Sequence, residues 1–290
     1  MPTLDDYRRD HPDIRPDFTI EQNWPGYTEA DHATWRTLYA RQETLLPSRA
    51  CKEYLDGMKR LEIGHDSIPD FEQLSEALHK LTRWIVVPVP GLVPDDVFFD
   101  HLANRRFPAG YFIRRPDQLD YIEEPDVFHD VFGHVPMLAH PVFADYMEAY
   151  GKGGLRAQSL GTLHNLARLY WYTVEFGLIR DQGAVRIYGS GIASSFAESV
   201  YAVESKSPNR IRFDLERVMR TKYRIDDFQE SYFVIESFDE LFKATYQDFA
   251  PIYARLKSGP TYEPGTILAN DTLYTRGTHT YKGGSHAASA

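Results

Sequence analysis

The sequence predicts a single, mainly α-helical domain with a small amount of β structure. Hydrophobic residues make up 42% of the 290 residues, which is enough for one full core. Most of the chain shows helical patterns, whereas only three short segments have the composition of strands. No internal repeat and no convincing linker divides the sequence, so we expect one domain rather than two.

The two ends of the chain differ in composition from the rest. Residues 1–30 are polar with scattered prolines, and we expect an extended arm there. The domain itself is expected over residues 31–257, followed by an extension over residues 258–290. From about residue 276 the extension is rich in Gly, Ser, Thr, His and Ala, so we expect it to be flexible from there.

The elements of the domain follow from local patterns. Amphipathic periodicity predicts helices, and proline followed by acidic residues marks one helix start. Runs of apolar and β-branched residues predict short strands. The expected helices, in chain order, are residues 29–46, 48–61, 68–82, 94–102, 141–151, 159–177 and 238–256. The expected strands are residues 84–89, 184–188 and 232–235.

Charge and cysteine content exclude several classes of protein. The net charge of −10 and the pI near 5.6 argue against a nucleic-acid-binding surface, which is usually basic. Cys51 is the only cysteine, so an internal disulfide framework is excluded and a reducing cytoplasm is expected. The N-terminus has no apolar signal core, and no run of about 18 apolar residues is present, so we expect no membrane span.

The most informative motif contains His129 and His134. Five residues along an α-helix are about 500° of rotation, so the two side chains would point about 140° apart. Both histidines therefore cannot bind one metal ion from an unbroken α-helix. Gly133 suits the left-handed residue that ends a helix, and Pro136 cannot continue one. We therefore expect a short helix over residues 125–132, after which His134 turns back towards the metal.

Glu175 is a single carboxylate in an otherwise apolar and aromatic helical segment. Burying a carboxylate is costly unless it is paired or binds a metal. Two imidazoles and one carboxylate form the set that holds non-haem Fe(II) and leaves positions open for oxygen and substrate. The same set also serves catalytic zinc, which makes a zinc hydrolase the rival interpretation. Spacing disfavours that rival, because zinc proteases place their two histidines four residues apart on one helical face.

Further motifs accompany the histidine pair in a fixed order. They include Val-Pro-Gly-Leu-Val-Pro at residues 89–94, Tyr-Trp-Tyr-Thr-Val-Glu-Phe-Gly at 170–177 and Tyr-Gly-Ser-Gly at 188–191. The other segments are residues 98, 102–105, 113–114, 194–196 and 232–238. With these motifs the chain from about residue 31 to 253 resembles the tetrahydrobiopterin-dependent aromatic amino acid hydroxylases, most closely the short bacterial phenylalanine hydroxylases.

The resemblance implies roles for individual residues. The implied iron ligands are His129, His134 and Glu175. Arg114 would grip the amino acid carboxylate, which a guanidinium fork matches with two hydrogen bonds. The other residues implied in substrate binding are Pro125, Trp171, Phe176, Ser194 and Ile225. Ser194 and Glu198 would also belong to the network that steadies an iron-ligating histidine.

The resemblance also implies where a pterin binds. The flat heterocycle would stack on Phe98, and the glycine of a nearby loop would permit close backbone approach. The residues implied in pterin binding are Gly91, Leu92, Val93, Phe98, Asp130 and Tyr170. Three residues depart from the family pattern, in which a glutamate, a threonine and a serine stand at the positions of Asp130, Ile122 and Asp95.

The implied reaction is the hydroxylation of L-phenylalanine to L-tyrosine by O2, with non-haem Fe(II) and a tetrahydropterin, tetrahydrobiopterin or a relative, as two-electron donor. Hydroxylation of tryptophan or tyrosine, a zinc hydrolase, and a non-catalytic module that has kept the fold are the alternatives. A functional link to pterin-recycling enzymes is expected, but no nucleic-acid or membrane partner. The chain leaves no room for a regulatory domain or a tetramerisation helix, so we expect a monomer that phenylalanine does not regulate.

Overall fold

The computed structural model describes residues 3–120, 122 and 124–281. In these residues the α-helices are α1 (Leu4–Arg8), α2 (Glu29–Leu45), α3 (Lys52–Arg60), α4 (Phe71–Thr82), α5 (Asp95–Ala103), α6 (Val135–Leu138), α7 (Pro141–Leu160), α8 (Leu163–Tyr170), α9 (Ser190–Ala193), α10 (Phe196–Glu204), α11 (Leu215–Arg220), α12 (Phe238–Thr245) and α13 (Ala250–Ser258). The π-helical turns are η4 (Phe128–His134) and η5 (Trp171–Glu175), and the 3-10 turns are η1 (Trp24–Gly26), η2 (Leu46–Ser48) and η3 (Pro116–Gln118). The strands are β1 (Ile85–Val89), β2 (Arg106–Gly110), β3 (Leu178–Asp181), β4 (Ala184–Ile187), β5 (Asn209–Arg212), β6 (Ser231–Ile235) and β7 (Leu273–Thr275).

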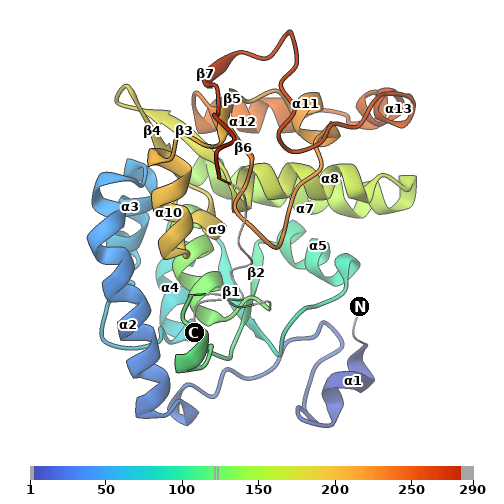
Figure 1. The fold of residues 1–290 in the computed structure, drawn as a ribbon. Helices are drawn as coiled ribbons and strands as arrows, with labels where there is room; N and C mark the ends of the chain where they lie inside the picture. The colour runs from blue at the N-terminus through green and yellow to red at the C-terminus, as the bar shows by residue number, and fades with distance from the viewer. Residues whose placement is uncertain (1–2, 121, 123, 282–290) are drawn as a thin grey trace.

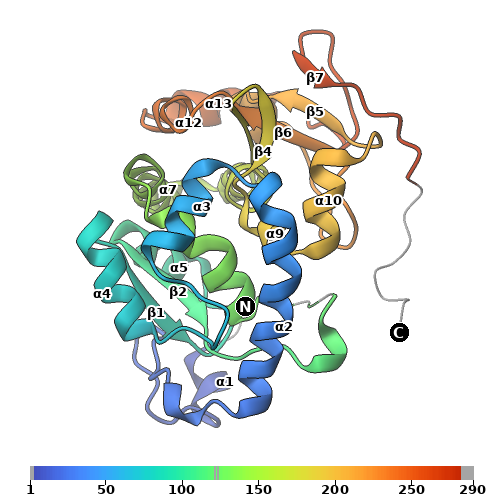
Figure 2. The same cartoon turned by 90° about the vertical axis from the view of Figure 1, so that its left-hand side faces the viewer.

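These elements form a mainly helical domain with minor β structure, as predicted (Figure 1). A five-stranded sheet lies at one end of the domain with α12 and α13, and the pair β1 and β2 lies at the other end with α4 and α5 (Figure 2). The long helix α7 passes between the two ends and packs on both α5 and α12. Among the described residues, no helix is both long and apolar enough to cross a lipid bilayer.

Capping side chains explain where several helices begin. Helix α2 follows Thr28, whose Oγ1 accepts the Asp31 N–H at 3.2 Å, while the Asp31 carboxylate accepts the Thr28 N–H at 2.7 Å. Helix α4 follows Asp70, whose carboxylate accepts the Glu72 N–H at 2.8 Å. Each cap satisfies amide groups that have no partner within the helix. Local sequence is therefore enough to set these two boundaries.

The five-stranded sheet has the order β4-β3-β6-β5-β7. Its central strand β6 pairs in parallel with both β3 and β5, so that Leu178 lies opposite Val234 and Ile211 opposite Phe233. Every residue of β6 is buried, which is typical of a parallel strand covered on both faces. Because η5 ends just before β3 begins, the sheet also positions the end of η5.

Helix α7 continues well beyond the end expected at Gly151. A Cβ atom at Gly151 would clash with the backbone of α5 at Ala103, and one at Gly154 would clash with the Phe99 ring. Helix propensity disfavours glycine in the middle of a helix by about 1 kcal/mol. The close packing of α7 on α5 nevertheless requires these glycines, so tertiary contact overrides local propensity here.

Two other predicted helices are divided in the structure. The helix expected over residues 159–177 is interrupted at Gly161, which has a φ of 67°, and resumes as α8 at Leu163. The final helix expected over residues 238–256 consists of α12 and α13. Pro251 lies in the first turn of α13, where its missing N–H is tolerated. In the middle of one continuous helix the same proline would remove a backbone hydrogen bond.

Both ends of the described chain have more structure than the sequence indicated. Residues 3–28 contain α1 and η1 instead of an extended arm. They contribute to a small apolar cluster that includes Ile14, Phe18, Ile20, Val93 and Val97. Residues 276–281, which were expected to be flexible, form defined hydrogen bonds with the segment before β5.

Candidate metal centre and adjoining pocket

His129 and His134 lie on η4, a π-helical turn, and not on an α-helix that ends before His134. In a π-helix each hydrogen bond joins residues five apart, so residues at that spacing lie about one turn apart. The spacing that would separate two side chains on an α-helix thus brings them together here. Their Nε2 atoms are 3.3 Å apart. The break predicted at Gly133 is therefore wrong, and the widened turn is the physical reason.

Gly133 serves close packing and not a left-handed turn. Gly161 and Gly183 are the only described glycines with a positive φ. A Cβ atom at Gly133 would lie 2.9 Å from the carbonyl oxygen of Ser190 in α9. Pro136 also does not end the helical path, because it lies in the first turn of α6, where a missing N–H is tolerated.

Replacing Gly133 by alanine is expected to lower the free energy of unfolding by about 1–3 kcal/mol, as overpacking usually does. The added methyl group would push α9 away from η4. Gly153→Ala is the matched control, because a Cβ atom there would meet no other atom within 4 Å. It should raise the free energy of unfolding by about 0.4–1 kcal/mol. Urea unfolding measures both, and a Gly133→Ala protein as stable as the wild type would contradict the packing argument.

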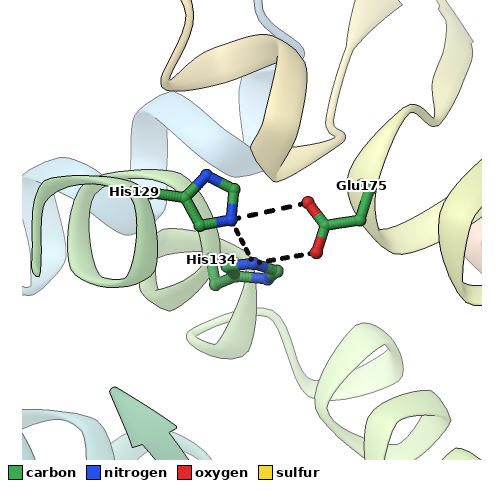
Figure 3. Close-up of side chains that lie close together, drawn as sticks. All are labelled: His129, His134 and Glu175. Atoms are coloured by element: carbon green, nitrogen blue, oxygen red, sulfur yellow. Dashed lines mark hydrogen bonds and ion pairs between the residues drawn. The ribbon is translucent and has the colours of Figure 1, made fainter. Parts of the chain in front are cut away.

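Glu175 is the last residue of η5, the π-helical turn that directly follows α8. Its carboxylate points towards the two histidines of η4 (Figure 3). Oε2 accepts a hydrogen bond from Ser190 Oγ at 2.9 Å. A Cβ atom at Gly189 would clash with the Glu175 carbonyl, so the start of α9 packs tightly behind this residue. Helix α9 therefore contacts both η4 and η5 and sets their separation.

The three predicted ligands converge on one point (Figure 3). His129 Nε2 is 3.6 Å from Glu175 Oε2, and His134 Nε2 is 3.3 Å from Glu175 Oε1. One ligand atom from each residue lies within 4.8 Å of the other two, a spacing that a single metal ion can bridge. Ligands grouped on one side of an ion leave its opposite positions open. The structure therefore brings these three residues into an arrangement that fits non-haem iron.

Ser194 determines which nitrogen of His129 faces the metal position. Ser194 Oγ donates to the Ser190 carbonyl at 2.8 Å, so its contact with His129 Nδ1 at 2.9 Å is one in which it accepts. His129 then carries its proton on Nδ1 and presents the lone pair of Nε2 to a cation. Hydrogen bonds of this kind orient the histidine ligands of metal sites.

The charges of the ligands also suit a cation. Burial lowers the pKa of His129 to about 4, so this imidazole is neutral at pH 7. Burial alone would raise the pKa of Glu175, but His134, His129 and the Ser190 hydroxyl outweigh it and lower the pKa to about 2. A metal ion requires a neutral imidazole and an ionised carboxylate. His129 and Glu175 are therefore in the protonation states that bind a metal.

Replacing Ser194 by alanine is expected to weaken metal binding about 10- to 100-fold, because His129 loses the acceptor that orients it. Ser199→Ala is the matched control: its buried hydroxyl donates to the Ile192 carbonyl at 2.7 Å and touches no ligand residue. Titration of the metal-free protein with cobalt(II), followed by absorption, measures the affinity. Equal affinities in the two variants would remove Ser194 from the network.

Arg114, predicted to bind the substrate carboxylate, is buried and paired with Asp126. Its Nε and Nη2 each donate to one oxygen of the Asp126 carboxylate at 2.8 Å. The same carboxylate accepts the backbone N–H of His129 at 3.0 Å. Burial acts to raise the pKa of Asp126, but the Arg114 guanidinium outweighs it and lowers the pKa. The sequence analysis did not assign a role to Asp126, although it lies only three residues before His129.

Trp171 and Phe176, predicted to line an aromatic pocket, pack together with their ring centroids 4.8 Å apart. Trp171 also stacks on Tyr223 at 4.3 Å, and its Nε1 donates to Gln229 Oε1 at 2.9 Å. Tyr223 and Gln229 were missed because no local pattern marks them. Ile225 lies between them in the chain but is 71% exposed, so the structure does not place it in a buried wall.

Phe98 and Tyr170, predicted to flank a pterin, are neighbours with their ring centroids 5.8 Å apart. The Tyr170 ring lies against the His134 ring at 6.3 Å. Phe98 is half-buried, so part of its ring is accessible. The residues expected to hold the flat cofactor are thus brought next to a predicted metal ligand.

The loop that contains Gly91, Leu92 and Val93 is held by two residues from distant parts of the chain. The Leu92 N–H donates to Glu124 Oε1 at 3.1 Å, and the Leu92 carbonyl accepts from the Tyr7 hydroxyl at 2.9 Å. A Cβ atom at Gly91 would meet the end of the Glu124 side chain, which would have to shift to admit it. The Leu92 side chain is 52% exposed, so one side of the loop is open.

Asp130 and Glu198 are buried carboxylates, and Asp130 is the residue that follows His129. Asp130 accepts the Gly110 N–H at 2.7 Å, and the Pro125 carbonyl also lies close to Gly110. Glu198 accepts from the Tyr232 hydroxyl, and its described hydrogen bonds include none to Ser194. Burial raises the pKa of each carboxyl group to about 7.

The remaining two departures from the family pattern lie at less buried positions. Asp95 is the first residue of α5, where a negative charge is favoured by the helix dipole. Ile122 is half-buried and has no polar side-chain atom that could contact a carboxylate. Neither position disturbs the geometry of the three metal ligands.

Comparison with known proteins agrees with the geometry of the site. The family model of biopterin-dependent aromatic amino acid hydroxylases matches residues 5–267. A phenylalanine-4-hydroxylase of Ralstonia nicotianae is 62% identical over 265 residues, which cover 91% of this chain and 85% of that protein. A phenylalanine-4-hydroxylase of Caulobacter vibrioides is 60% identical over 270 residues, which cover 93% of this chain and 92% of that protein.

Solved structures show the same similarity. The iron- and phenylalanine-bound crystal structure of phenylalanine hydroxylase from Chromobacterium violaceum has a TM-score of 0.87 and 55% sequence identity. The matched residues cover 94% of this chain and 100% of the chain in that crystal structure. A structure of the same enzyme with bound Fe(III) has a TM-score of 0.88 and 56% identity, with 94% and 100% covered. The chain belongs to the biopterin-dependent aromatic amino acid hydroxylases.

Proposed function

We propose that this protein is a phenylalanine 4-monooxygenase. It would convert L-phenylalanine to L-tyrosine with O2, non-haem Fe(II) and a tetrahydropterin. The observation that carries the proposal is the convergence of His129, His134 and Glu175 beside two sets of aromatic residues. One set surrounds Trp171 and suits an aromatic side chain, and the other, Phe98 with Tyr170, suits a flat heterocycle.

The residues present fit an iron ion. His129 and Glu175 are in their metal-binding protonation states, and Ser194 orients the first of them. Two imidazole nitrogens 3.3 Å apart would repel one another if both presented lone pairs without a proton or a cation between them. When bound, iron and the reduced pterin supply the activation of O2 and the electrons that the protein's own side chains cannot provide.

The protein's own residues would bind and orient the amino acid. The Arg114 guanidinium is held by Asp126, and among the described residues its Nη1 makes one long hydrogen bond, 3.4 Å, to the Leu119 carbonyl. Nη1 is therefore the part of the guanidinium best placed to take a substrate carboxylate. Trp171 and Phe176 offer ring faces to the substrate ring, and such contacts contribute about 0.5–1.5 kcal/mol beyond burial.

A pterin would stack on the accessible part of the Phe98 ring, beside Tyr170. The backbone groups of Leu92 are bonded to Glu124 and Tyr7, so a pterin that uses them must displace these two side chains. Asp130 is set back from the loop, bonded to Gly110. We therefore expect its contact with a pterin to run through water.

Reconstitution tests this function. The metal-free protein is loaded with Fe(II) without oxygen and then given O2, a tetrahydropterin and phenylalanine, and tyrosine is measured by chromatography. Tyrosine formed only with iron and pterin together supports the proposal. Zinc-loaded and pterin-free samples are the controls, and faster hydroxylation of tryptophan or tyrosine would change the substrate. Hydrolytic turnover sustained by zinc would overturn the proposal.

We further propose that residues 31–257 act as the catalytic domain of a cytoplasmic monomer that is linked to pterin-recycling enzymes. The single cysteine, Cys51, is fully buried. The net charge of −10 disfavours association between copies of the chain and binding to nucleic acid or anionic membranes. Sedimentation is expected to give the mass of one chain, 33.5 kDa, with and without phenylalanine. A stable tetramer, or sigmoidal phenylalanine kinetics, would contradict this.

A further inference from the structure

The segment Gly277–Tyr281 follows β7 and passes alongside α10 (Figure 2). Its backbone is bound to the segment before β5: the Thr278 N–H donates to the Lys206 carbonyl at 2.9 Å and the His279 N–H to the Ser207 carbonyl at 3.1 Å. A Cβ atom at Gly277 would clash with the Ser207 carbonyl, so the approach is as close as glycine allows. We call the segment Gly277–Tyr281 the strap.

The strap ends at Tyr281, which contacts the loop 223–230. The Tyr281 N–H donates to Ser207 Oγ at 2.9 Å, which fixes the backbone at this point. Its hydroxyl donates to Asp227 Oδ1 at 3.0 Å. Its ring packs on Phe228, with the centroids 5.2 Å apart, and Phe228 in turn stacks on Tyr201 of α10 at 4.3 Å. The loop is thus clamped between α10 and the strap.

The clamped loop carries two of the residues that hold Trp171, namely Tyr223 and Gln229. Gln229 Oε1 accepts the indole N–H of Trp171 at 2.9 Å, and Tyr223 stacks on the indole at 4.3 Å. The Gln229 amide is itself oriented from within the loop, because its Nε2 donates to the Arg224 carbonyl at 2.9 Å. A continuous path of contacts therefore leads from Tyr281 through the loop to the indole.

On the outer side of the loop, Arg224 and Ile225 contribute little to holding it in place. Ile225 is 71% exposed, and the ion pairs of Arg224 with Asp226 and Asp227 are long, at 3.4 Å each. The pair with Asp226 is exposed, and exposed ion pairs contribute little to stability. The Asp227 side chain is only 4% exposed, and it accepts hydrogen bonds from both Arg224 and the Tyr281 hydroxyl, of which the second is the shorter, 3.0 Å against 3.4 Å.

We propose that the strap positions the aromatic wall of the substrate pocket, and that Tyr281 is a positioning residue for the aromatic amino acid. This rests on the proposed function, in which Trp171 contacts the substrate ring. Without Tyr281 the loop moves more freely, and Gln229 and Tyr223 no longer hold the indole in one place. The pocket then binds phenylalanine less tightly and discriminates less well between aromatic side chains.

Three variants test the strap. Tyr281→Phe keeps the ring and removes the hydroxyl, Tyr281→Ala removes both, and a chain that ends after Arg276 removes the strap. Tyr274→Phe is the matched control, because it removes another tyrosine–carboxylate hydrogen bond, to Glu236, from the same end of the chain. The measurements are KM and kcat for phenylalanine, KM for the pterin, iron content, and the ratio of kcat/KM for phenylalanine to that for tryptophan.

Tyr281→Phe is expected to raise the KM for phenylalanine about three- to tenfold, the range that the loss of one ordinary hydrogen bond covers. Tyr281→Ala and the shortened chain should raise it further and lower the phenylalanine-to-tryptophan ratio. Iron content and the KM for the pterin should match those of the Tyr274→Phe control. This pattern separates positioning from a general loss of stability, which would lower the apparent kcat, the iron content and the midpoint of thermal unfolding without a selective rise in the KM for phenylalanine.

Two results would overturn the proposal. One is that the chain ending after Arg276 keeps the wild-type KM for phenylalanine and the wild-type ratio of kcat/KM for phenylalanine to that for tryptophan. The other is that KM, kcat and iron content all change together with the midpoint of thermal unfolding. Wild-type turnover, measured in the same series, tests the proposed function separately. No tyrosine from the wild type would overturn the function, whereas normal wild-type turnover with unchanged variants would overturn only the role of the strap.

Discussion

Replacing Glu175 by alanine is expected to abolish iron binding and to lower tyrosine formation by more than about 100-fold, beyond the loss that follows removal of a residue supporting a ligand. Glu175 supplies the only carboxylate of the three-ligand set, and its oxygens lie 3.6 Å and 3.3 Å from the two histidine Nε2 atoms. Without it, two neutral imidazoles would have to hold a divalent cation alone. Iron content per chain and tyrosine formation measure the effect.

The conservative variant Glu175→Gln is the control for this experiment. The amide keeps the size of the side chain and can still accept from Ser190, but it lacks the negative charge. Its metal affinity should fall between those of the wild type and the alanine variant. All three proteins should be folded and show a cooperative thermal unfolding transition. One iron per chain and normal turnover in Glu175→Ala would refute the assignment of this residue as a ligand.

Replacing Arg114 by alanine is expected to have two separate effects. It leaves the Asp126 carboxylate buried without its partner, which should lower the free energy of unfolding by about 3–5 kcal/mol. It also removes the group that would bind the substrate carboxylate, so the KM for phenylalanine should rise, with a loss of about 1.5–3 kcal/mol for a charged hydrogen bond. Urea unfolding and steady-state kinetics measure the two effects independently.

Two variants separate these effects. Arg114→Lys keeps the charge beside Asp126 but lacks the planar fork, so it should recover stability more than it recovers the KM. Arg115→Ala breaks only an exposed pair with Asp117, in which both side chains are about 70% exposed, and should change stability by less than about 1 kcal/mol. An unchanged KM in Arg114→Ala would remove Arg114 from the substrate site.

The sequence alone was sufficient for the fold class, the position of most helices and the choice of three residues that the structure brings together as a possible metal site. Helix caps such as Thr28 with Asp31 are local, so their effect can be predicted from a few neighbouring residues. The ligands could be predicted because a lone carboxylate in an apolar segment, such as Glu175, is costly unless something binds it. The residue types, and the free energy needed to bury each of them, can be known from the sequence without the fold.

Tertiary structure decided how those ligands meet. The π-helical turns η4 and η5 place His129, His134 and Glu175 together, and the packing of Gly133 against Ser190 holds η4 and α9 close to one another. A local pattern favoured a helix end at Gly133 because glycine is compatible with both a turn and a close approach. Only the neighbouring element determines which of these two uses applies.

Long-range contacts explain the remaining differences. Asp126, Tyr223, Gln229 and Tyr281 were not predicted, because each acts on a partner that is distant in sequence or hidden by the fold. Composition predicted a helix end at Gly151 and a flexible segment from about residue 276, of which the structure describes residues 276–281. In the structure, packing against α5 and hydrogen bonds to residues 206–209 provide the free energy that composition alone could not indicate.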